Sequence, residues 1–118
     1  MANIETRPWG TFEYLTRGMG YLVKRLTVRP RQCTSLQYHV HRAEHLTIVE
    51  GEAQITVGVT SSRHAVGDSI TIPRRAKHRI ECVGMGALTI IEVWTGSELD
   101  EGDIVRIEDN YGRVTKSG

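Results

Sequence analysis

Apolar and polar residues alternate along most of this chain, in short runs that Gly, Pro or Asp interrupts. A period of two residues is typical of antiparallel strands with one buried face, and helical periodicity is scarce. The pattern predicts strands at residues 21–28, 35–39, 45–49, 53–57, 69–72, 78–83 and 88–94, with turns at 17–20, 29–31, 50–52, 61–63, 67–68, 73–77 and 84–86. So many short strands predict an all-β closed sandwich or barrel of the jelly-roll type, because closure removes exposed sheet edges.

The length of the chain sets the number of domains. A chain of 118 residues is long enough for one hydrophobic core and too short for two ordinary domains. No internal repeat or linker divides it, so we expect one domain over residues 1–118. Residues 97–113 are rich in charge but keep apolar positions, which predicts a segment that packs on the barrel. Residues 114–118 are expected to form a frayed tail.

Charge and composition narrow the classes of partner. The chain has 15 basic and 14 acidic side chains and no basic block, which argues against nucleic-acid and membrane-surface partners. The first residues contain no apolar stretch long enough for a signal peptide or a membrane span, so we expect a cytoplasmic protein. Cys33 and Cys82 are too few for a disulfide framework and are predicted to be reduced thiols in the core.

Four side chains with metal-binding atoms are predicted to point into the barrel. Gln37 and His39 are two residues apart and therefore share one face of their strand, and His41 can extend that face. Glu44 opens the next strand, and His78 shares a face with apolar residues, which marks that face as inward. Nitrogen and oxygen donors of these types suit one divalent ion, with Zn the first candidate and Mn, Co, Ni or Fe the others.

Two charged residues interrupt apolar strand faces. Lys24 is in parity with Leu22 and Leu26, so it is either an edge residue whose ammonium group reaches water or an inward cation for a phosphate or an oxyanion. Glu92 is in parity with Ile90, and it is either a salt-bridge partner, for example of Lys24, or a catalytic base. The sequence pattern leaves these alternatives open.

Arginines supply the candidate phosphate ligands. Arg42, Arg106 and Arg113 carry forked donors that suit a phosphate group, although each one alone can also be a solvated surface charge. Tyr111 is predicted to be a packing residue, like the two tryptophans, and joins the substrate site only if the C-terminal segment folds over the mouth of the barrel. His45 is either a surface residue, a residue that orients a ligand, or a candidate base.

The spacing of the predicted ligands resembles the two motifs of the cupin superfamily. The first is Gln37-x-His39, four residues, Glu44, six residues and a Gly; the second is Gly67, five residues, a Pro, and then His78 at the expected offset. The resemblance implies a double-stranded β-helix, that is, a jelly-roll barrel. Arg31 and Arg75 stand where cupins usually have Gly, and we expect both to flank the barrel mouth.

A narrower resemblance covers nearly the whole chain. The motifs that carry it are Arg7-Pro-Trp-Gly, Val23-Lys-Arg, Ser35-Leu-Gln, His41-Arg-Ala-Glu-His, Ile91-Glu-Val, Asp103-Ile-Val-Arg and Asp109-x-Tyr-Gly-Arg. They are similar to those of type II mannose-6-phosphate isomerases. In that family the domain commonly forms the C-terminal part of a bifunctional mannose-1-phosphate guanylyltransferase and isomerase.

The resemblance implies a metal-dependent isomerase that interconverts mannose 6-phosphate and fructose 6-phosphate. Glu92, Lys24 or His45 would move the proton, and Arg42, beside the ligands, becomes the favoured phosphate contact. Two alternatives remain: a non-catalytic sugar-binding cupin, and a metal-dependent cupin enzyme that acts on another small sugar or acid. The expected partners are a small phosphorylated sugar and, from the cupin resemblance, a second copy of the chain in a homodimer with a contact around Trp9.

Overall fold

The computed structural model describes residues 3–113, and every regular element in that range is a β-strand. The strands are β1 (Asn3–Arg7), β2 (Gly10–Gly18), β3 (Tyr21–Val28), β4 (Leu36–Tyr38), β5 (Arg42–Glu50), β6 (Ala53–Val57), β7 (Thr60–His64), β8 (Ser69–Ile72), β9 (His78–Cys82), β10 (Leu88–Gly96) and β11 (Val105–Glu108). The predicted tail, 114–118, lies outside the described residues. Within residues 3–113 no helix is long and apolar enough to cross a membrane.

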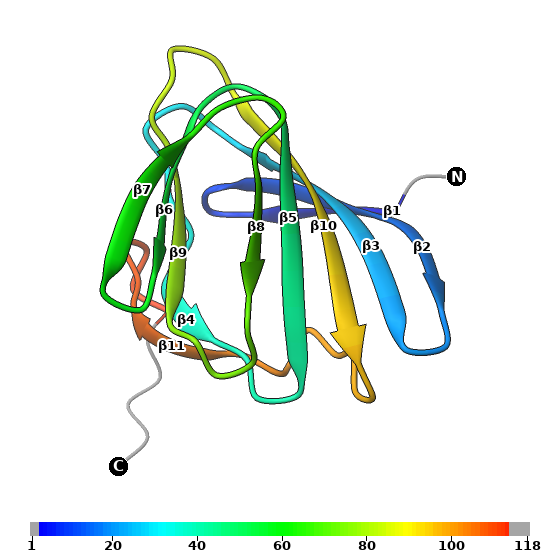
Figure 1. The fold of residues 1–118 in the computed structure, drawn as a ribbon. Coiled ribbons are helices and arrows are strands. Elements are labelled where there is room, and N and C mark those ends of the chain that lie inside the picture. Colours follow the sequence, from blue (N-terminus) through cyan, green and yellow to red (C-terminus); the bar gives the residue numbers. More distant parts are fainter. Residues whose placement is uncertain (1–2, 114–118) are drawn as a thin grey trace.

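The strands form two antiparallel sheets that face each other (Figure 1). The six-stranded sheet has the order β1-β2-β3-β10-β5-β8, and the five-stranded sheet has the order β11-β4-β9-β6-β7. Strand β10 lies between β3 and β5, which come from distant parts of the chain. Its register with β3 is continuous, and its register with β5 shifts between Thr89 and Ile90. The predicted all-β jelly-roll architecture is confirmed.

The inward faces divide the barrel interior into an apolar part and a charged part. Along β10 the inward residues Leu88 and Ile90 belong to the hydrophobic core, and Glu92 follows them on the same face. Along β3 the order is reversed, because Val28 lies in the core and Lys24 lies toward the start of the strand. Because β3 and β10 are antiparallel, both buried charges fall at the same end of the barrel.

Alternation predicts the two-faced strands well and the exposed edge strand poorly. The bounds predicted for β3, β6 and β8 are those observed. The turn predicted at 61–63 is wrong, because these residues lie inside β7 (Thr60–His64), and the chain turns at 58–59 instead. The side chains of β7 are almost all polar and exposed at a sheet edge, so no apolar period marks the strand. Strands β1, β2 and β11 were also not predicted.

The two arginines in place of cupin glycines adopt the left-handed conformation, with φ of 67° at both Arg31 and Arg75. The Arg75 amide donates to the His39 carbonyl at 2.7 Å, so Arg75 lies at the end of the barrel that carries the candidate ligands. The Arg31 amide donates to the carbonyl of Cys82, at the opposite end of β9 from His78. The expectation that Arg31 flanks the mouth is therefore wrong. Cys33 and Cys82 are buried and unbridged.

Candidate active site

Three of the four predicted metal ligands meet inside the charged part of the barrel. His39 follows β4, Glu44 lies in β5, and His78 opens β9; their exposed fractions are 2%, 3% and 1%. Their donor atoms all lie within 4.8 Å of one another. The Nε2 atom of His39 is 3.2 Å from one Glu44 oxygen, and Nε2 of His78 is 3.7 Å from the other.

Backbone carbonyls orient both imidazole rings. Nδ1 of His39 lies 2.7 Å from the Asp103 carbonyl, and Nδ1 of His78 lies 2.9 Å from the Ala76 carbonyl. A carbonyl only accepts, so each ring donates from Nδ1 and turns its Nε2 atom toward Glu44. Burial, followed by the charges of Arg42 and His78, lowers the pKa of His39 to about 4 against the opposing effect of Glu44. His39 is therefore neutral at physiological pH, as a metal ligand must be.

Arg42 holds the Glu44 carboxylate rather than standing free in the cavity. Its Nε donates to Glu44 at 2.8 Å, and its guanidinium group covers the Trp94 ring at 3.3 Å from the centroid. Burial alone would raise the pKa of Glu44, but His39, His78 and Arg42 outweigh it and hold that pKa below its ordinary value. Glu44 is consequently an ionised donor. Arg42, which was predicted to contact the substrate phosphate, is therefore already paired with Glu44.

Gln37 borders the group through its amide nitrogen. Ser35 Oγ donates to the Gln37 side-chain oxygen at 2.5 Å, and the amide nitrogen lies 3.3 Å from His39 Nε2. A half-turn of the amide would exchange the two atoms and present the oxygen to the histidines. Two imidazoles and an ionised carboxylate, with this amide beside them, fit the N and O donor set of a first-row divalent ion.

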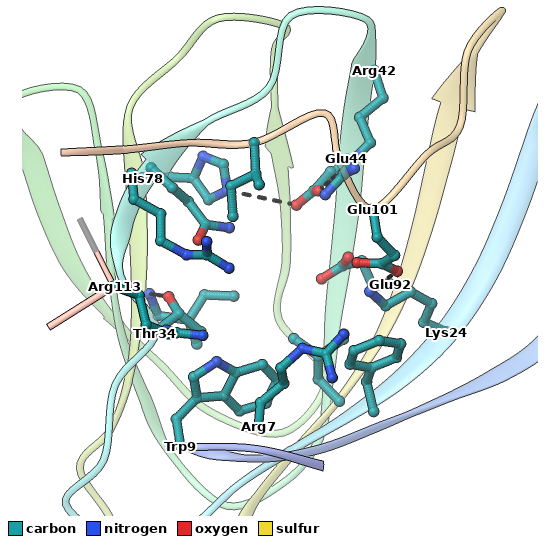
Figure 2. Close-up of a pocket in the computed structure, with 16 residues that line it drawn as sticks. Arg7, Trp9, Lys24, Thr34, Arg42, Glu44, His78, Glu92, Glu101 and Arg113 are labelled. Atoms are coloured by element: carbon teal, nitrogen blue, oxygen red, sulfur yellow. Dashed lines mark hydrogen bonds and ion pairs between the residues drawn. The ribbon is translucent and has the colours of Figure 1, made fainter. Parts of the chain in front are cut away.

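A cavity of about 90 Å³ is lined by Gln37, Glu44 and His78 of the predicted ligands and carries many charges (Figure 2). Its cationic lining residues are Arg7, Lys24, Arg42, Arg106 and Arg113, and its carboxylates are Glu44, Glu92 and Glu101. In Figure 2 His78, Glu44 and Arg42 lie at the top, Glu92 and Glu101 at the right, and Arg7 at the bottom. Cations outnumber carboxylates, so the cavity suits an anionic ligand.

Lys24 is an inward cation and not an edge residue, because only 5% of it is exposed. Its Nζ donates to Glu101 at 2.9 Å and lies over the rings of Phe12 and Trp94, at 3.8 and 4.3 Å from their centroids. Tyr14 donates to the same Glu101 oxygen at 2.7 Å. Glu101 thus fixes the Lys24 ammonium group at the cavity wall.

Glu92 is buried close to the candidate ligands. It is 4% exposed and lies opposite Lys24 in the register of β10 and β3. The Lys24 ammonium group forms its ion pair with Glu101, so the salt bridge suggested between Lys24 and Glu92 is not formed. The Trp94 indole donates to Glu92. Burial, followed by the charge of Glu44, raises the pKa of Glu92 to about 7 despite the opposing charge of Lys24. A carboxyl of this kind exchanges protons near neutral pH.

Two predicted site residues belong neither to the cavity lining nor to the ligand group. His45 is exposed on the outer face of β5, with Nδ1 3.1 Å from the Thr71 hydroxyl. Strand parity is the physical reason, because His45 follows Glu44 directly and must point the opposite way. Tyr111 packs against the hydrophobic core and donates its hydroxyl to Gln32. The assignments of His45 as base and Tyr111 as substrate contact are corrected accordingly.

Residues 97–113 were predicted to pack on the barrel, but the sequence pattern did not show that the part between β10 and β11 borders the site. The Asp103 carboxylate accepts the amides of Val40 and His41 at 2.9 and 2.8 Å, and its carbonyl orients His39. Glu101 holds Lys24, and the Asp100 carbonyl accepts from Arg42 at 3.1 Å. We call residues 98–104 the acidic strap. In the sequence it is a run of carboxylates without strand periodicity, and its Asp103 begins one of the motifs that carry the family resemblance.

Comparison with known proteins places the chain among sugar-metabolism proteins. A family model described as mannose-6-phosphate isomerase C-terminal matches residues 2–109. The chain is 45% identical over 108 residues to mannose-1-phosphate guanylyltransferase ManC of Salmonella typhimurium, covering 92% of this chain and 22% of that protein. It is 45% identical over 107 residues to the alginate biosynthesis protein AlgA of Pseudomonas syringae, covering 91% and 22%. The chain therefore spans about a fifth of the length of these relatives.

Solved structures share the fold at low sequence identity. A cupin-2 domain of Rhodospirillum rubrum superposes with a TM-score of 0.74 at 21% identity, covering 86% of this chain and 78% of that one. Oxalate decarboxylase of Bacillus subtilis superposes with a TM-score of 0.76 at 16% identity, covering 90% and 30%. The predicted cupin fold is confirmed by these likenesses, which carry no information about the reaction.

Proposed function

Because this chain belongs to the mannose-6-phosphate isomerase C-terminal family, we propose that it interconverts mannose 6-phosphate and fructose 6-phosphate. The observation that carries the proposal is one cavity, in which Glu44 and His78 of the ligand group face a buried carboxyl and several guanidinium groups. The family match supports a role in sugar metabolism, and the charges of the cavity support a phosphorylated substrate. The guanylyltransferase activity named for the longer relatives is not part of the proposal.

In the proposed reaction, a metal ion would polarise the substrate oxygens, and protein side chains would transfer the protons. A divalent ion held by His39, Glu44 and His78 would act as a Lewis acid on the oxygens of the ring-opened sugar. Zn is the first candidate, followed by Mn, Co, Ni and Fe, all of which accept these donors. The neutral state of His39 and the ionised state of Glu44 prepare the donors for that role.

Glu92 is the proposed base. An aldose–ketose isomerisation removes the proton from carbon 2 and returns a proton to carbon 1, while the hydroxyl proton of carbon 2 passes to the carbonyl oxygen. A group that first accepts and then donates a proton works best with a pKa near the working pH, and that of Glu92 is about 7. Lys24, fixed by Glu101, would stabilise the negative charge that develops on the substrate oxygens.

The test is a coupled assay of fructose 6-phosphate formed from mannose 6-phosphate. The protein is stripped of metal and reconstituted with Zn, Mn, Co or Ni, beside Glu92→Gln and the outward-facing control His45→Gln. We expect metal-restored turnover that Glu92→Gln abolishes and His45→Gln retains. Metal and sugar-phosphate binding without turnover would favour the sugar-binding alternative. Equal turnover of unphosphorylated mannose would favour the other-substrate alternative. The homodimer and the cytoplasmic location stay predictions.

A further inference from the structure

Three guanidinium groups come together where the two sheets of the barrel meet. Arg7 ends β1, the outermost strand of the six-stranded sheet. Arg106 lies in β11, the outermost strand of the five-stranded sheet, and Arg113 follows that strand. All three line the cavity, so a cluster of positive charge closes it from both sheet edges. We call these three residues the seam arginines.

Among the described residues, only one of the three seam arginines forms an ion pair with a carboxylate. Arg113 is held by Asp109, which accepts from Nε at 2.7 Å and from Nη2 at 3.0 Å. The Nε of Arg106 is buried and has no hydrogen-bond partner within residues 3–113. Burial, followed by the charge of Arg113, lowers the pKa of Arg106; Arg7 adds to the effect, and Asp109 opposes it. An unpartnered buried donor between like charges is unfavourable unless a ligand supplies the acceptor.

The position of the cluster matches one end of the proposed substrate. Figure 2 shows Arg7 across the cavity from Glu44 and Arg42. In an open-chain hexose 6-phosphate the carbonyl and the phosphate are at opposite ends of the carbon chain. A phosphate dianion accepts several forked hydrogen bonds at once, which guanidinium groups supply and ammonium groups do not.

We propose that Arg7, Arg106 and Arg113 form the binding site of the substrate phosphate, which we call the seat. Arg7, contributed by the first strand, is then a specificity-determining residue. This inference rests on the proposed function for the identity of the sugar. Asp109 is the positioning residue that aims Arg113, and Arg106 supplies the buried Nε that the phosphate satisfies. Arg42, already paired with Glu44, is then a residue of the metal side of the cavity.

Binding of inorganic phosphate to the metal-free protein, measured by calorimetry, tests the seat without any turnover. We expect Arg7→Gln to weaken phosphate binding by at least about tenfold, Arg7→Lys to weaken it less, and the exposed control Arg63→Gln to leave it unchanged. In active enzyme, Arg7→Gln should raise the KM for mannose 6-phosphate more than it lowers kcat. If Arg7→Gln left both the phosphate affinity and the KM for mannose 6-phosphate unchanged, the proposed phosphate-binding site would be refuted.

A second variant separates binding from folding. Arg106→Gln removes a buried unpartnered donor, so its midpoint of thermal unfolding without phosphate should equal or exceed that of the wild type, while its phosphate affinity falls. A lower midpoint together with unchanged phosphate affinity would show that Arg106 is structural and would contradict the seat. Phosphate binding that depends on Arg7 in a protein without isomerase activity would leave the seat intact and refute the isomerase alone.

Discussion

Replacing Glu92 by Gln should stabilise the metal-free protein at alkaline pH. Glu92 is 4% exposed, and burial raises the pKa of its carboxyl from 4.5 to about 7, with Glu44 adding to the rise. A carboxyl whose pKa is raised on folding contributes its full stability below the pKa of the unfolded chain and loses it as the pH rises through the folded pKa. In the wild type the contribution of Glu92 to the unfolding free energy is therefore lost between roughly pH 4.5 and pH 7. The Glu92→Gln variant has no such loss, because its carboxamide does not ionise.

The size of the effect follows from the two pKa values of Glu92. At 1.36 kcal/mol for each pKa unit, the wild type has lost about 1.4 kcal/mol of unfolding free energy at about pH 5.5 and about 3.4 kcal/mol at about pH 8.5. The stability of Glu92→Gln relative to the wild type should therefore improve by about 2 kcal/mol between these conditions. The carboxamide oxygen can still accept from the Trp94 indole, so packing changes little.

Urea unfolding in a chelating buffer, followed by tryptophan fluorescence at both pH values, measures the difference. The exposed variant Glu81→Gln is the matched control and should give a difference that does not change with pH. His39 is present in the wild type and in both variants, so its effect on the unfolding free energy cancels in each difference. A stability difference for Glu92→Gln that is the same at both pH values would refute the reasoning, because Glu92 would then keep one ionisation state throughout.

The remaining predictions concern the ligands and the turns. His78→Ala should weaken Co²⁺ binding, followed by visible absorption, by more than about 100-fold, and His45→Ala should leave it unchanged; equal losses would contradict the ligand assignment. Arg75→Gly should raise the unfolding free energy by about 1 kcal/mol, because it relieves a left-handed arginine with φ of 67°; lower stability in urea would contradict this. Gly51→Ala should cost about 1–3 kcal/mol in the same assay, because a Cβ would lie 2.6 Å from the Ala87 carbonyl oxygen at φ of +85°; wild-type stability would show that the turn relaxes.

Strand parity accounts for what could be predicted from the sequence. Where one face of a strand is apolar, a charged residue in phase with that face is a candidate for the barrel interior. His78 and Glu92 are buried as this predicts, and so is Lys24, for which an edge position had stayed open. The same parity places His45 outside, and its selection as a candidate base did not take that constraint into account. Parity is a reliable guide because shifting a strand by one residue would expose its whole apolar face.

The parts of the site that were missed come from segments without a period. Glu101 and Asp103 lie in the acidic strap, whose conformation depends on contacts with β3 and with the residues after β4. Arg7 lies at the end of a short, exposed strand, and its place at the cavity depends on how the two sheets meet. Such contacts join residues far apart in the sequence, and no local pattern records them.

The seam has a consequence for the order in which the molecule assembles. The donors His39, Glu44 and His78 come from one central stretch of the chain, whereas Arg7 and Arg106 belong to its first and last strands. Contacts between residues far apart in sequence require closure of a longer loop, which costs more chain entropy and slows their formation. The seam arginines are therefore expected to meet late in folding, and so is the contact by which the Asp103 carbonyl orients His39. Binding of a sugar phosphate would then report completed folding.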